Sequence, residues 1–301
     1  QPGDEVIVPA FTYVATAEVI SLLKLKPVFA EVLPNTFNLD IQQLESKISS
    51  STKAIMVVHL FGQCADMEPL LALAEKFQIS VIEDNAQALG AVYTFSDGSK
   101  KYSGTMGTIG TTSFFPTKNL GTYGDGGAMF AQDEHLSATL RQIANHGQKQ
   151  KYYHEILGVN SRLDTLHAAI LSVKLKYLPE YEMARKKVAS FYDRELSNLP
   201  GIEIPVRNPS STHVFHQYTL RVKNNMREKF RTFLSEKGIP TMVYYPLPQH
   251  LQKACEMYGY KKGDFPISEK LSEEVCSLPI HTELKQEELE YITQHIKSFF
   301  K

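Results

Sequence analysis

Lys118 lies between an apolar run and a turn that is dense in glycine. Residues 111–115 are typical of a short buried strand. Four glycines then let the backbone pass close to a ligand: Gly121, Gly124, Gly126 and Gly127. A lysine on such a bend is poorly hydrated, which lowers the pKa of its amine and frees the lone pair for Schiff-base chemistry with an aldehyde or ketone. This stretch alone leaves a solvated surface lysine as the alternative.

A second segment ends in a carboxylate that suits the same chemistry. Residues 80–87 form an apolar strand pattern that ends at Asp84. Because parallel strands present their carboxyl ends at one edge of a sheet, we expect Asp84 to face the same crevice as Lys118. An acid there can keep a pyridinium nitrogen protonated, which is the expected pairing beside a lysine that holds pyridoxal phosphate (PLP). A helix N-cap or a turn is the alternative role for Asp84.

The elements that must position these two residues alternate in type along the first half of the chain. The pattern predicts strands over residues 6–8, 27–32, 54–60, 81–82 and 126–131, and helices over 12–25, 41–48, 67–77 and 134–145. Apolar strands that alternate with helices favour a mostly parallel α/β sheet covered on both faces. Residues 93–110 are rich in turns and predict an irregular excursion.

The pattern changes in the second half. It predicts helices over 161–175, 180–196, 226–237, 268–276 and 286–299, with strands over 218–222 and 241–244. Ser161 and Asp164 have the spacing of a capping box. We therefore expect a large domain over residues 1–185 and a smaller α/β domain over residues 186–301.

Composition excludes several classes of function. The chain has 301 residues, 43% of them hydrophobic, and a net charge of −1, so nothing recruits nucleic acid or an anionic membrane as a partner. The cysteines lack CxxC spacing and predict reduced thiols without a metal site: Cys64, Cys255 and Cys276. No apolar run reaches the roughly 18 residues of a membrane span. We expect a soluble cytoplasmic protein.

Several spaced motifs carry a resemblance to a known family. They are Asp84-x-x-Gln87, the run over 113–121, Gly124-Asp-Gly-Gly127 and the run over 160–164. Together they resemble the DegT/DnrJ/StrS family of PLP-dependent nucleotide-sugar aminotransferases, from Pro2 to at least Pro248. The resemblance implies the aspartate-aminotransferase-like (type I PLP) fold and a homodimer. In that family several tens of residues precede this point, including a Gly-Thr-x-Ala-Leu helix start that binds the cofactor phosphate, and we expect that segment to be missing here.

The resemblance assigns cofactor contacts to five residues. Lys118 would hold PLP as a Schiff base and shuttle the proton, and Asp84 would bond the pyridine nitrogen. Gln87 would donate to the ring's phenolate oxygen, Tyr13 would stack on the ring, and Ser113 would donate to the phosphate. The alternatives are an ordinary helix residue for Gln87, core packing for Tyr13, and a capping or turn role for Ser113.

Three further residues are assigned to the partner subunit or the sugar. Asn160 resembles a residue that reaches the phosphate of the neighbouring subunit's cofactor, so that the active site is shared across a two-fold interface. Arg162, again from the partner, would meet an anionic group of the sugar nucleotide. Tyr245 stands among residues that contact the sugar, although Tyr244 occupies a position where some members carry histidine. A cap or turn is the alternative for Asn160, and a surface salt bridge for Arg162.

The implied reaction is a ping-pong transfer of an amino group from L-glutamate to a keto-sugar nucleotide. The subgroup most similar in its motifs aminates carbon 3 of UDP-2-acetamido-2-deoxy-3-oxo-glucuronate or of dTDP-3-oxo-6-deoxyhexoses, the former for surface polysaccharide. Amination at carbon 4 and an inactive or regulatory relative are the alternatives. A PLP sugar dehydratase would carry histidine in place of Lys118. Two other signals are weak: His59 is typical of a satisfied core histidine, and Gly104-x-x-Gly107-x-x-Gly110 is not a dinucleotide fingerprint.

Overall fold

The order of strands and helices follows the predicted alternation through the first half of the chain. The computed structural model describes residues 1–301. The strands are β1 (Glu5–Pro9), β2 (Lys26–Ala30), β3 (Thr52–Val58), β4 (Ser80–Asp84), β5 (Val92–Thr94), β6 (Lys100–Tyr102), β7 (Ile109–Ser113), β8 (Gly127–Phe130), β9 (Gln148–Gln150), β10 (Tyr153–His154), β11 (Ile202–Glu203), β12 (Tyr218–Val222) and β13 (Val275–Leu278). The α-helices are α1 (Ala15–Leu22), α2 (Met67–Phe77), α3 (Glu134–Ala144), α4 (Thr165–Lys174), α5 (Leu178–Leu196), α6 (Arg227–Glu236), α7 (Pro266–Glu274) and α8 (Gln286–Phe299).

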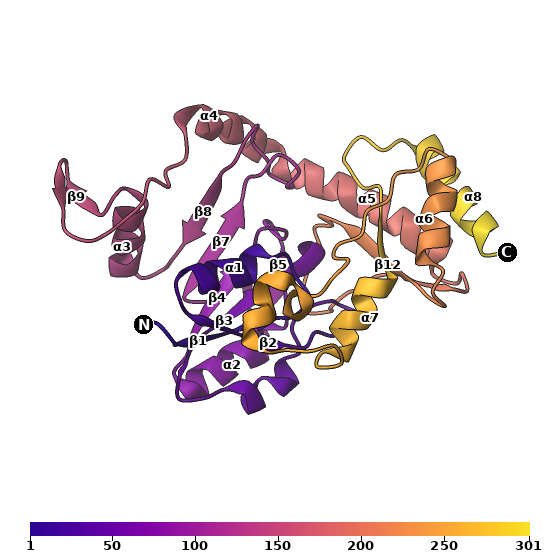
Figure 1. The fold of residues 1–301 in the computed structure, drawn as a ribbon. Helices are drawn as coiled ribbons and strands as arrows, with labels where there is room; N and C mark the ends of the chain where they lie inside the picture. Colours follow the sequence, from indigo (N-terminus) through magenta and orange to yellow (C-terminus); the bar gives the residue numbers. More distant parts are fainter.

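A six-stranded sheet forms the centre of the molecule (Figure 1). Its strand order is β2-β1-β3-β4-β7-β8, and every neighbouring pair is parallel except β7 with β8. Asp84 at the end of β4 lies in register with Thr111 of β7. The carboxyl ends of β1, β3, β4 and β7 therefore meet at one edge of the sheet, where ligands bind in folds of this class. The expected mostly parallel sheet is confirmed.

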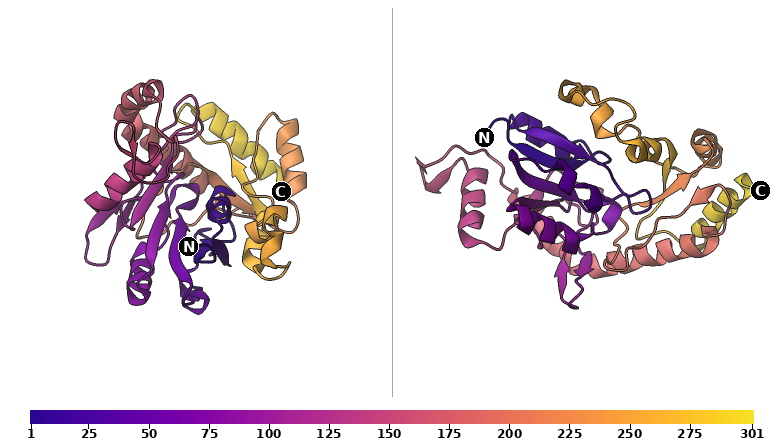
Figure 2. Two further views of the ribbon diagram at one scale, coloured as in Figure 1. Left: turned by 60° about the vertical axis from the view of Figure 1, so that its left-hand side comes forward. Right: turned by 90° about the horizontal axis from the view of Figure 1, so that it is seen from below.

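The two faces of this sheet are buried in separate clusters. One cluster contains α2 residues packed on the strands, among them Ile7, Ile55, Val57, Leu70 and Val81. The other contains α1 residues and also side chains from much later in the sequence, among them Val8, Ala17, Phe29, Cys255 and Phe265. Residues 253–265 therefore return to cover the α1 face, although they are distant in sequence (Figure 2).

A second core lies beyond the sheet, around the antiparallel sheet β11-β12-β13. Helices α5, α6 and α8 pack on it through buried side chains such as Phe191, Phe230 and Ile292, which meet Leu220 of β12. The expected smaller α/β unit is present in this part of the chain. The expected boundary after residue 185 falls inside α5 and stays a prediction. None of the helices combines the length and the apolar character that a membrane span needs.

The β9-β10 hairpin and α3 stand away from the central sheet, as Figure 1 and the right-hand view of Figure 2 show. The hairpin carries the exposed side chains of Tyr152 and Tyr153, and Leu157 is exposed on the connection that follows it. Further exposed apolar side chains, Leu166 and Val173, lie on α4. Such gathered apolar surface is uncommon on a monomer.

Several predicted bounds are wrong. The helix expected over 12–25 starts only at Ala15, because the Thr12 carbonyl accepts from Gln249 Nε2, and it ends before Lys24, which has a left-handed φ of 60°. The helix expected over 41–48 is two 3₁₀ turns on either side of the buried Leu44.

Three errors fall in the second half. The strand expected over 241–244 is one isolated bridge between Met242 and Ser277, in a stretch bracketed by prolines that cannot donate to a ladder. The helix expected over 268–276 stops at Glu274, and β13 begins at Val275 because Cys276 and Leu278 are buried in the second core and Val275 is buried in a neighbouring cluster. The capping box at Ser161 does not form, since α4 starts at Thr165.

Candidate active site

Lys118 and Asp84 face each other at the carboxyl edge of the large sheet. Asp84 ends β4, and Lys118 follows β7 on a turn closed by its N–H donating to the Phe115 carbonyl at 2.9 Å. Burial lowers the pKa of the Lys118 amine below its ordinary value, and the negative charge of Asp84 opposes that shift. The amine has no hydrogen-bond partner in the protein. A poorly hydrated amine beside a carboxylate is what covalent carbonyl chemistry requires.

The Asp84 carboxylate is fixed in place by two donors. Its Oδ1 accepts from the Ala86 N–H at 3.0 Å, and its Oδ2 accepts from Thr16 Oγ1 at 3.3 Å. Asp84 therefore does accept a turn hydrogen bond, which was the alternative role. Its carboxylate still faces Lys118 at the edge of the sheet. Thr16, buried on α1, was not anticipated from the sequence, because only the packing of α1 on the sheet brings it to β4.

Two tyrosines and an amide form one wall of the site. The Tyr13 ring is 57% exposed, which excludes the alternative of core packing, and its centroid lies 6.0 Å from that of Tyr245. Gln87 donates from Nε2 to Tyr245 Oη at 3.0 Å and accepts from the Phe61 N–H at 2.7 Å. These two bonds orient the amide so that its N–H₂ points into the site. The neighbouring Phe11 is 1% exposed and belongs to the core.

Tyr245 reaches this wall because its segment is tied to the loop after β1. Gln249 donates from its backbone N–H to the Ala10 carbonyl at 2.7 Å and from Nε2 to the Thr12 carbonyl at 2.6 Å. Burial raises the pKa of the Tyr245 hydroxyl well above its ordinary range, and the Asp84 charge acts in the same direction. The hydroxyl therefore stays protonated and can donate to a ligand.

Ser113 is the last residue of β7, at the same edge of the sheet. Its Oγ accepts from the Phe115 N–H at 3.2 Å, so the alternative turn role is also realised. That contact uses a lone pair and leaves the hydroxyl hydrogen free to donate. Ser113, Lys118, Asp84, Gln87 and Tyr13 thus come from elements that end at one edge.

A histidine lies beside the lysine, although no pattern in the sequence pointed to it. His216 is buried, and its pKa is held well below the ordinary value, first by burial and then by the charges of Lys118 and Arg185. Arg185 fixes the segment that carries it, since Nη1 donates to the Phe215 carbonyl at 2.9 Å and to the Ile280 carbonyl at 3.2 Å. The site thus contains a neutral imidazole that only tertiary packing delivers.

Asn160 and Arg162 do not join this group within the chain. Both are exposed on the connection between β10 and α4. Arg162 donates from Nε to Asn160 Oδ1 at 3.2 Å and from Nη1 to Asn145 Oδ1 at 3.4 Å, and it lines an open hollow between α3 and β8. Arg162 makes no salt bridge within the chain, so the alternative role of a surface salt bridge is excluded for the single chain.

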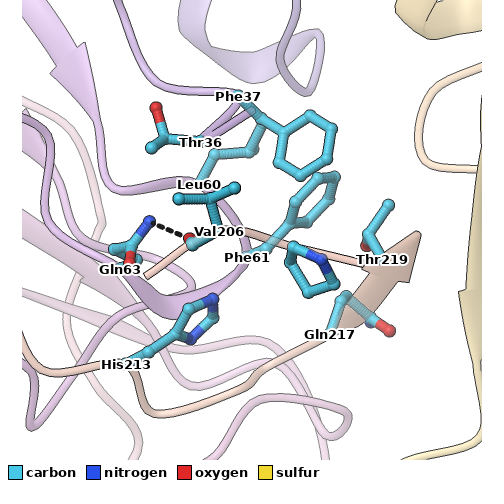
Figure 3. Close-up of a pocket in the computed structure, with 10 residues that line it drawn as sticks. Thr36, Phe37, Leu60, Phe61, Gln63, Val206, His213, Gln217 and Thr219 are labelled. Atoms are coloured by element: carbon cyan, nitrogen blue, oxygen red, sulfur yellow. Dashed lines mark hydrogen bonds between the residues drawn. The ribbon is translucent and has the colours of Figure 1, made fainter. Parts of the chain in front are cut away.

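A separate pocket lies behind the site (Figure 3). It is formed where residues 60–63 meet residues 205–219, and Gln63 Nε2 donates there to the Val206 carbonyl at 3.3 Å. None of the predicted site residues lines it. Phe61 separates the two, since its side chain lines the pocket while its N–H holds Gln87 on the other side.

The residues present fit the expected cofactor. An amine without a protein partner faces a carboxylate, an exposed tyrosine ring stands beside them, and an amide and a hydroxyl point to the same edge. These are the groups that a pyridine ring with an aldehyde, a phenolate oxygen and a phosphate needs. The acids and histidines nearby do not form a cluster that could hold a metal ion.

Comparison with known proteins finds close relatives. A "Pleiotropic regulatory protein" of Geobacillus stearothermophilus is 48% identical over 302 residues, which cover 100% of this chain and 79% of the relative. The UDP-2-acetamido-2-deoxy-3-oxo-D-glucuronate aminotransferase of Pseudomonas aeruginosa is 48% identical over 280 residues, which cover 93% and 75%.

Solved structures agree with these sequences. DesV of S. venezuelae, in complex with a ketimine intermediate, superposes with a TM-score of 0.95 at 37% identity, over 100% of this chain and 79% of that one. The expected fold is confirmed by this similarity. The sequence profile of the DegT/DnrJ/EryC1/StrS aminotransferase family matches residues 1–297. The chain therefore belongs to the DegT/DnrJ/EryC1/StrS aminotransferase family.

Proposed function

We propose that this protein transfers an amino group from L-glutamate to the keto group at carbon 3 of a nucleotide-linked sugar. The observation that carries the proposal is the meeting of Lys118 and Asp84 across the carboxyl edge of the sheet. The protein is an aminotransferase, and its cofactor is pyridoxal phosphate. The chemistry that this cofactor supplies when bound is an electron sink for the carbon that loses or gains a proton.

The side chains divide the remaining work. Lys118 would hold the cofactor through Nζ and carry a proton at the same atom, because burial keeps its amine less basic than an ordinary lysine. Asp84 would accept from the pyridine nitrogen, and Gln87 would donate from Nε2 to the ring oxygen. Tyr13 would stack on the ring and exclude water from one face. Ser113 would donate its free hydroxyl hydrogen to the phosphate.

The sugar would lie beyond Tyr13 and Tyr245. The Tyr245 hydroxyl, kept protonated by burial, can donate to a sugar oxygen. Arg162 offers a guanidinium without a carboxylate partner, which suits a uronate or a phosphate through paired donors. The 3-oxo-glucuronate relative supports carbon 3 as the position of the amino group. Amination at carbon 4 is the competing reaction. A panel of 3-keto and 4-keto nucleotide sugars would distinguish the two.

A homodimer with shared sites is part of the proposal. The exposed apolar surface of the β9-β10 hairpin, of the connection after it and of α4 includes Leu157, which is 98% exposed, and Tyr152, which is 78% exposed. A second copy that covered this surface would bury it, and Asn160 and Arg162, which lie on the connection between the hairpin and α4, would then be able to reach the partner's site. The isolation of these two residues from Lys118 within one chain supports this arrangement.

We place the reaction in the cytoplasm, as a step toward surface polysaccharide precursors. Three free buried cysteines, none of them paired, are in keeping with a reducing compartment: Cys64, Cys255 and Cys276. The polysaccharide role rests on the substrate class alone.

The decisive experiment is covalent capture of the cofactor. We expect borohydride treatment of the PLP-loaded protein to fix the cofactor onto Lys118, as detected by peptide mass spectrometry, and Lys118→Ala to abolish the adduct. Lys174→Ala is the matched control, because its amine donates to the Gly121 carbonyl on the same loop. Glutamate should then bleach the absorption of the loaded wild type, and an aminated product should form with 3-keto nucleotide sugars. An adduct that persists in Lys118→Ala contradicts the proposal.

A further inference from the structure

A buried carboxylate lies directly behind Asp84, on the other face of β4. Successive residues of a strand point to opposite faces, so Glu83 points toward α2 while Asp84 points toward α1. Glu83 is 0% exposed and belongs to no part of the site described above. A charge buried so completely must be held by several donors.

Three backbone N–H groups and one imidazole supply those donors. Gly104 donates to Glu83 Oε2 at 2.7 Å, while Met106 and Gly107 donate to Oε1 at 2.6 and 2.5 Å. His59 Nε2 lies 2.8 Å from Oε2. Burial opposes ionisation of Glu83, but the bonds from His59 and from the backbone outweigh it and lower the pKa of this carboxyl.

The imidazole adds a hydrogen bond without adding a charge. The Ala65 N–H donates to His59 Nδ1 at 3.2 Å, so we assign the ring proton to Nε2, which donates to Glu83. His59 is therefore neutral, and Glu83 keeps a full negative charge in the core. The expectation of a satisfied core histidine is confirmed by these contacts and by its 0% exposure.

The glycine pattern that failed as a dinucleotide fingerprint explains the loop. Gly104 has a φ of +82°, and a Cβ there would lie 2.9 Å from Asn85 Nδ2. A Cβ at Gly107 would lie 2.7 Å from the Val81 carbonyl oxygen. The loop can approach β4 and aim its N–H groups at Glu83 only without these side chains.

The same contacts reach the backbone of Asp84. The His59 N–H donates to the Asp84 carbonyl at 3.1 Å, so His59 is hydrogen-bonded to both Glu83 and Asp84 on β4. Thr111 Oγ1 donates to the Glu83 carbonyl at 3.2 Å, and the Asn85 N–H donates to the Thr111 carbonyl at 2.8 Å. The end of β4 is thereby held on both sides, at the residue whose carboxylate enters the site.

We propose that Glu83 is a positioning residue, which fixes the orientation of Asp84 from the opposite face of β4 and places a second negative charge behind it. The inference rests on the proposed function, because it concerns how Asp84 meets the cofactor. Glu83→Gln keeps the size of the side chain but removes the charge. Its amide N–H₂ group would also face the Gly104 N–H or the His59 Nε2–H, so a donor meets a donor.

Glu31 provides a matched control. It is 5% exposed and accepts from three backbone N–H groups, those of Val32 at 3.0 Å and of Ile267 and Ser268 at 2.9 Å. It follows β2 at the edge of the same sheet and touches no site residue. Glu31→Gln therefore removes a comparably buried and hydrogen-bonded carboxylate, but it leaves the contacts that hold Asp84 unchanged.

The test compares both variants with wild type in the full chain. In the cofactor-free protein, we expect Glu83→Gln to speed amide hydrogen exchange over residues 103–108, and Glu31→Gln to leave it unchanged. In titrations with PLP, Glu83→Gln should raise the dissociation constant about tenfold, the factor for loss of about 1.4 kcal/mol. Glu31→Gln should stay within about twofold of wild type.

A spectroscopic readout separates positioning from packing. Removing a negative charge behind Asp84 should move the pH midpoint of the Lys118-dependent absorption band to lower pH in Glu83→Gln and leave it in place in Glu31→Gln. If Glu83→Gln does not fold, Gly104→Ala tests the positioning alone, because it displaces one N–H from the carboxylate and keeps the Glu83 charge. We expect it to speed amide hydrogen exchange over residues 103–108 and to raise the dissociation constant of PLP.

Two results would overturn the inference alone. One is a normal wild-type band together with an unchanged dissociation constant and midpoint in Glu83→Gln, or, where that variant does not fold, an unchanged dissociation constant in Gly104→Ala. The other is an equal effect in Glu31→Gln. A wild-type chain without any Lys118-dependent band would instead overturn the proposed function, and this inference would fall with it.

Discussion

Replacing Asp84 by asparagine separates the stability of the site from its chemistry. The substitution keeps Oδ1, which accepts from the Ala86 N–H, and it places an N–H₂ group where Oδ2 accepted from Thr16 Oγ1. The threonine hydroxyl can rotate and accept from that amide, so both local hydrogen bonds survive. We therefore expect the free energy of unfolding of the cofactor-free protein to change by less than about 1 kcal/mol.

Cofactor binding should respond far more strongly. A hydrogen bond to a charged group contributes roughly 1.5–3 kcal/mol, and the neutral amide no longer favours a protonated pyridine nitrogen. That range corresponds to a roughly 10- to 150-fold rise in the dissociation constant of PLP. Capture by borohydride should still occur at Lys118, because the amine is unchanged.

The assay is an absorbance titration with PLP, with thermal unfolding of the same samples. Asp133→Asn is the control, since Asp133 also accepts a local N–H, that of Leu136 at 2.6 Å, but lies at the start of α3 away from the site. Affinity within threefold of wild type in Asp84→Asn would refute the assigned role and leave Asp84 as a turn residue only. So would a loss of affinity equal to that of Asp133→Asn.

Two further predictions concern pH and assembly. Lys118→Met should raise the unfolding temperature of the cofactor-free protein at neutral pH, because a lowered pKa in the folded state means that the charged amine destabilises the fold. This gain in stability should fade as the pH rises from the lowered pKa toward the ordinary lysine value. A gain that is constant with pH would contradict the prediction. Mixing Lys118→Ala with Asn160→Ala protomers, each poorly active alone, should restore about a quarter of wild-type activity, because half of the random dimers would contain one intact shared site. Activity no greater than the sum of the separate variants would argue against sites shared between subunits.

Much of the site was predictable because its chemistry is encoded in local runs. Lys118 follows a strand and precedes a glycine-dense turn, while Asp84 ends an apolar strand three residues before Gln87. The alternation of strands and helices then implied a parallel sheet, whose geometry sends both strand ends to one edge. For Tyr13 the sequence left core packing open, and the exposure of the side chain rules that alternative out. Its stacking on the cofactor ring stays a prediction.

Other features depend on contacts between distant segments. Thr16, His216 and Tyr245 reach Asp84, Lys118 and Gln87 respectively only after helices and returning loops have packed on the sheet. No local pattern in the sequence reports such a contact. The errors in element bounds have the same origin, since buried side chains such as Leu44 and Val275 overrode the local periodicity.

The amino-acid sequence by itself determined which side chains can do the chemistry and that their strands end together, because residue type and periodicity are local properties. Tertiary structure alone decided how those side chains are held: the neutral imidazole beside the lysine, the tyrosine against Gln87, and the ionised Glu83 behind Asp84. Burial, charge and hydrogen-bond geometry arise from segments far apart in the chain, and they exist only once the chain has folded.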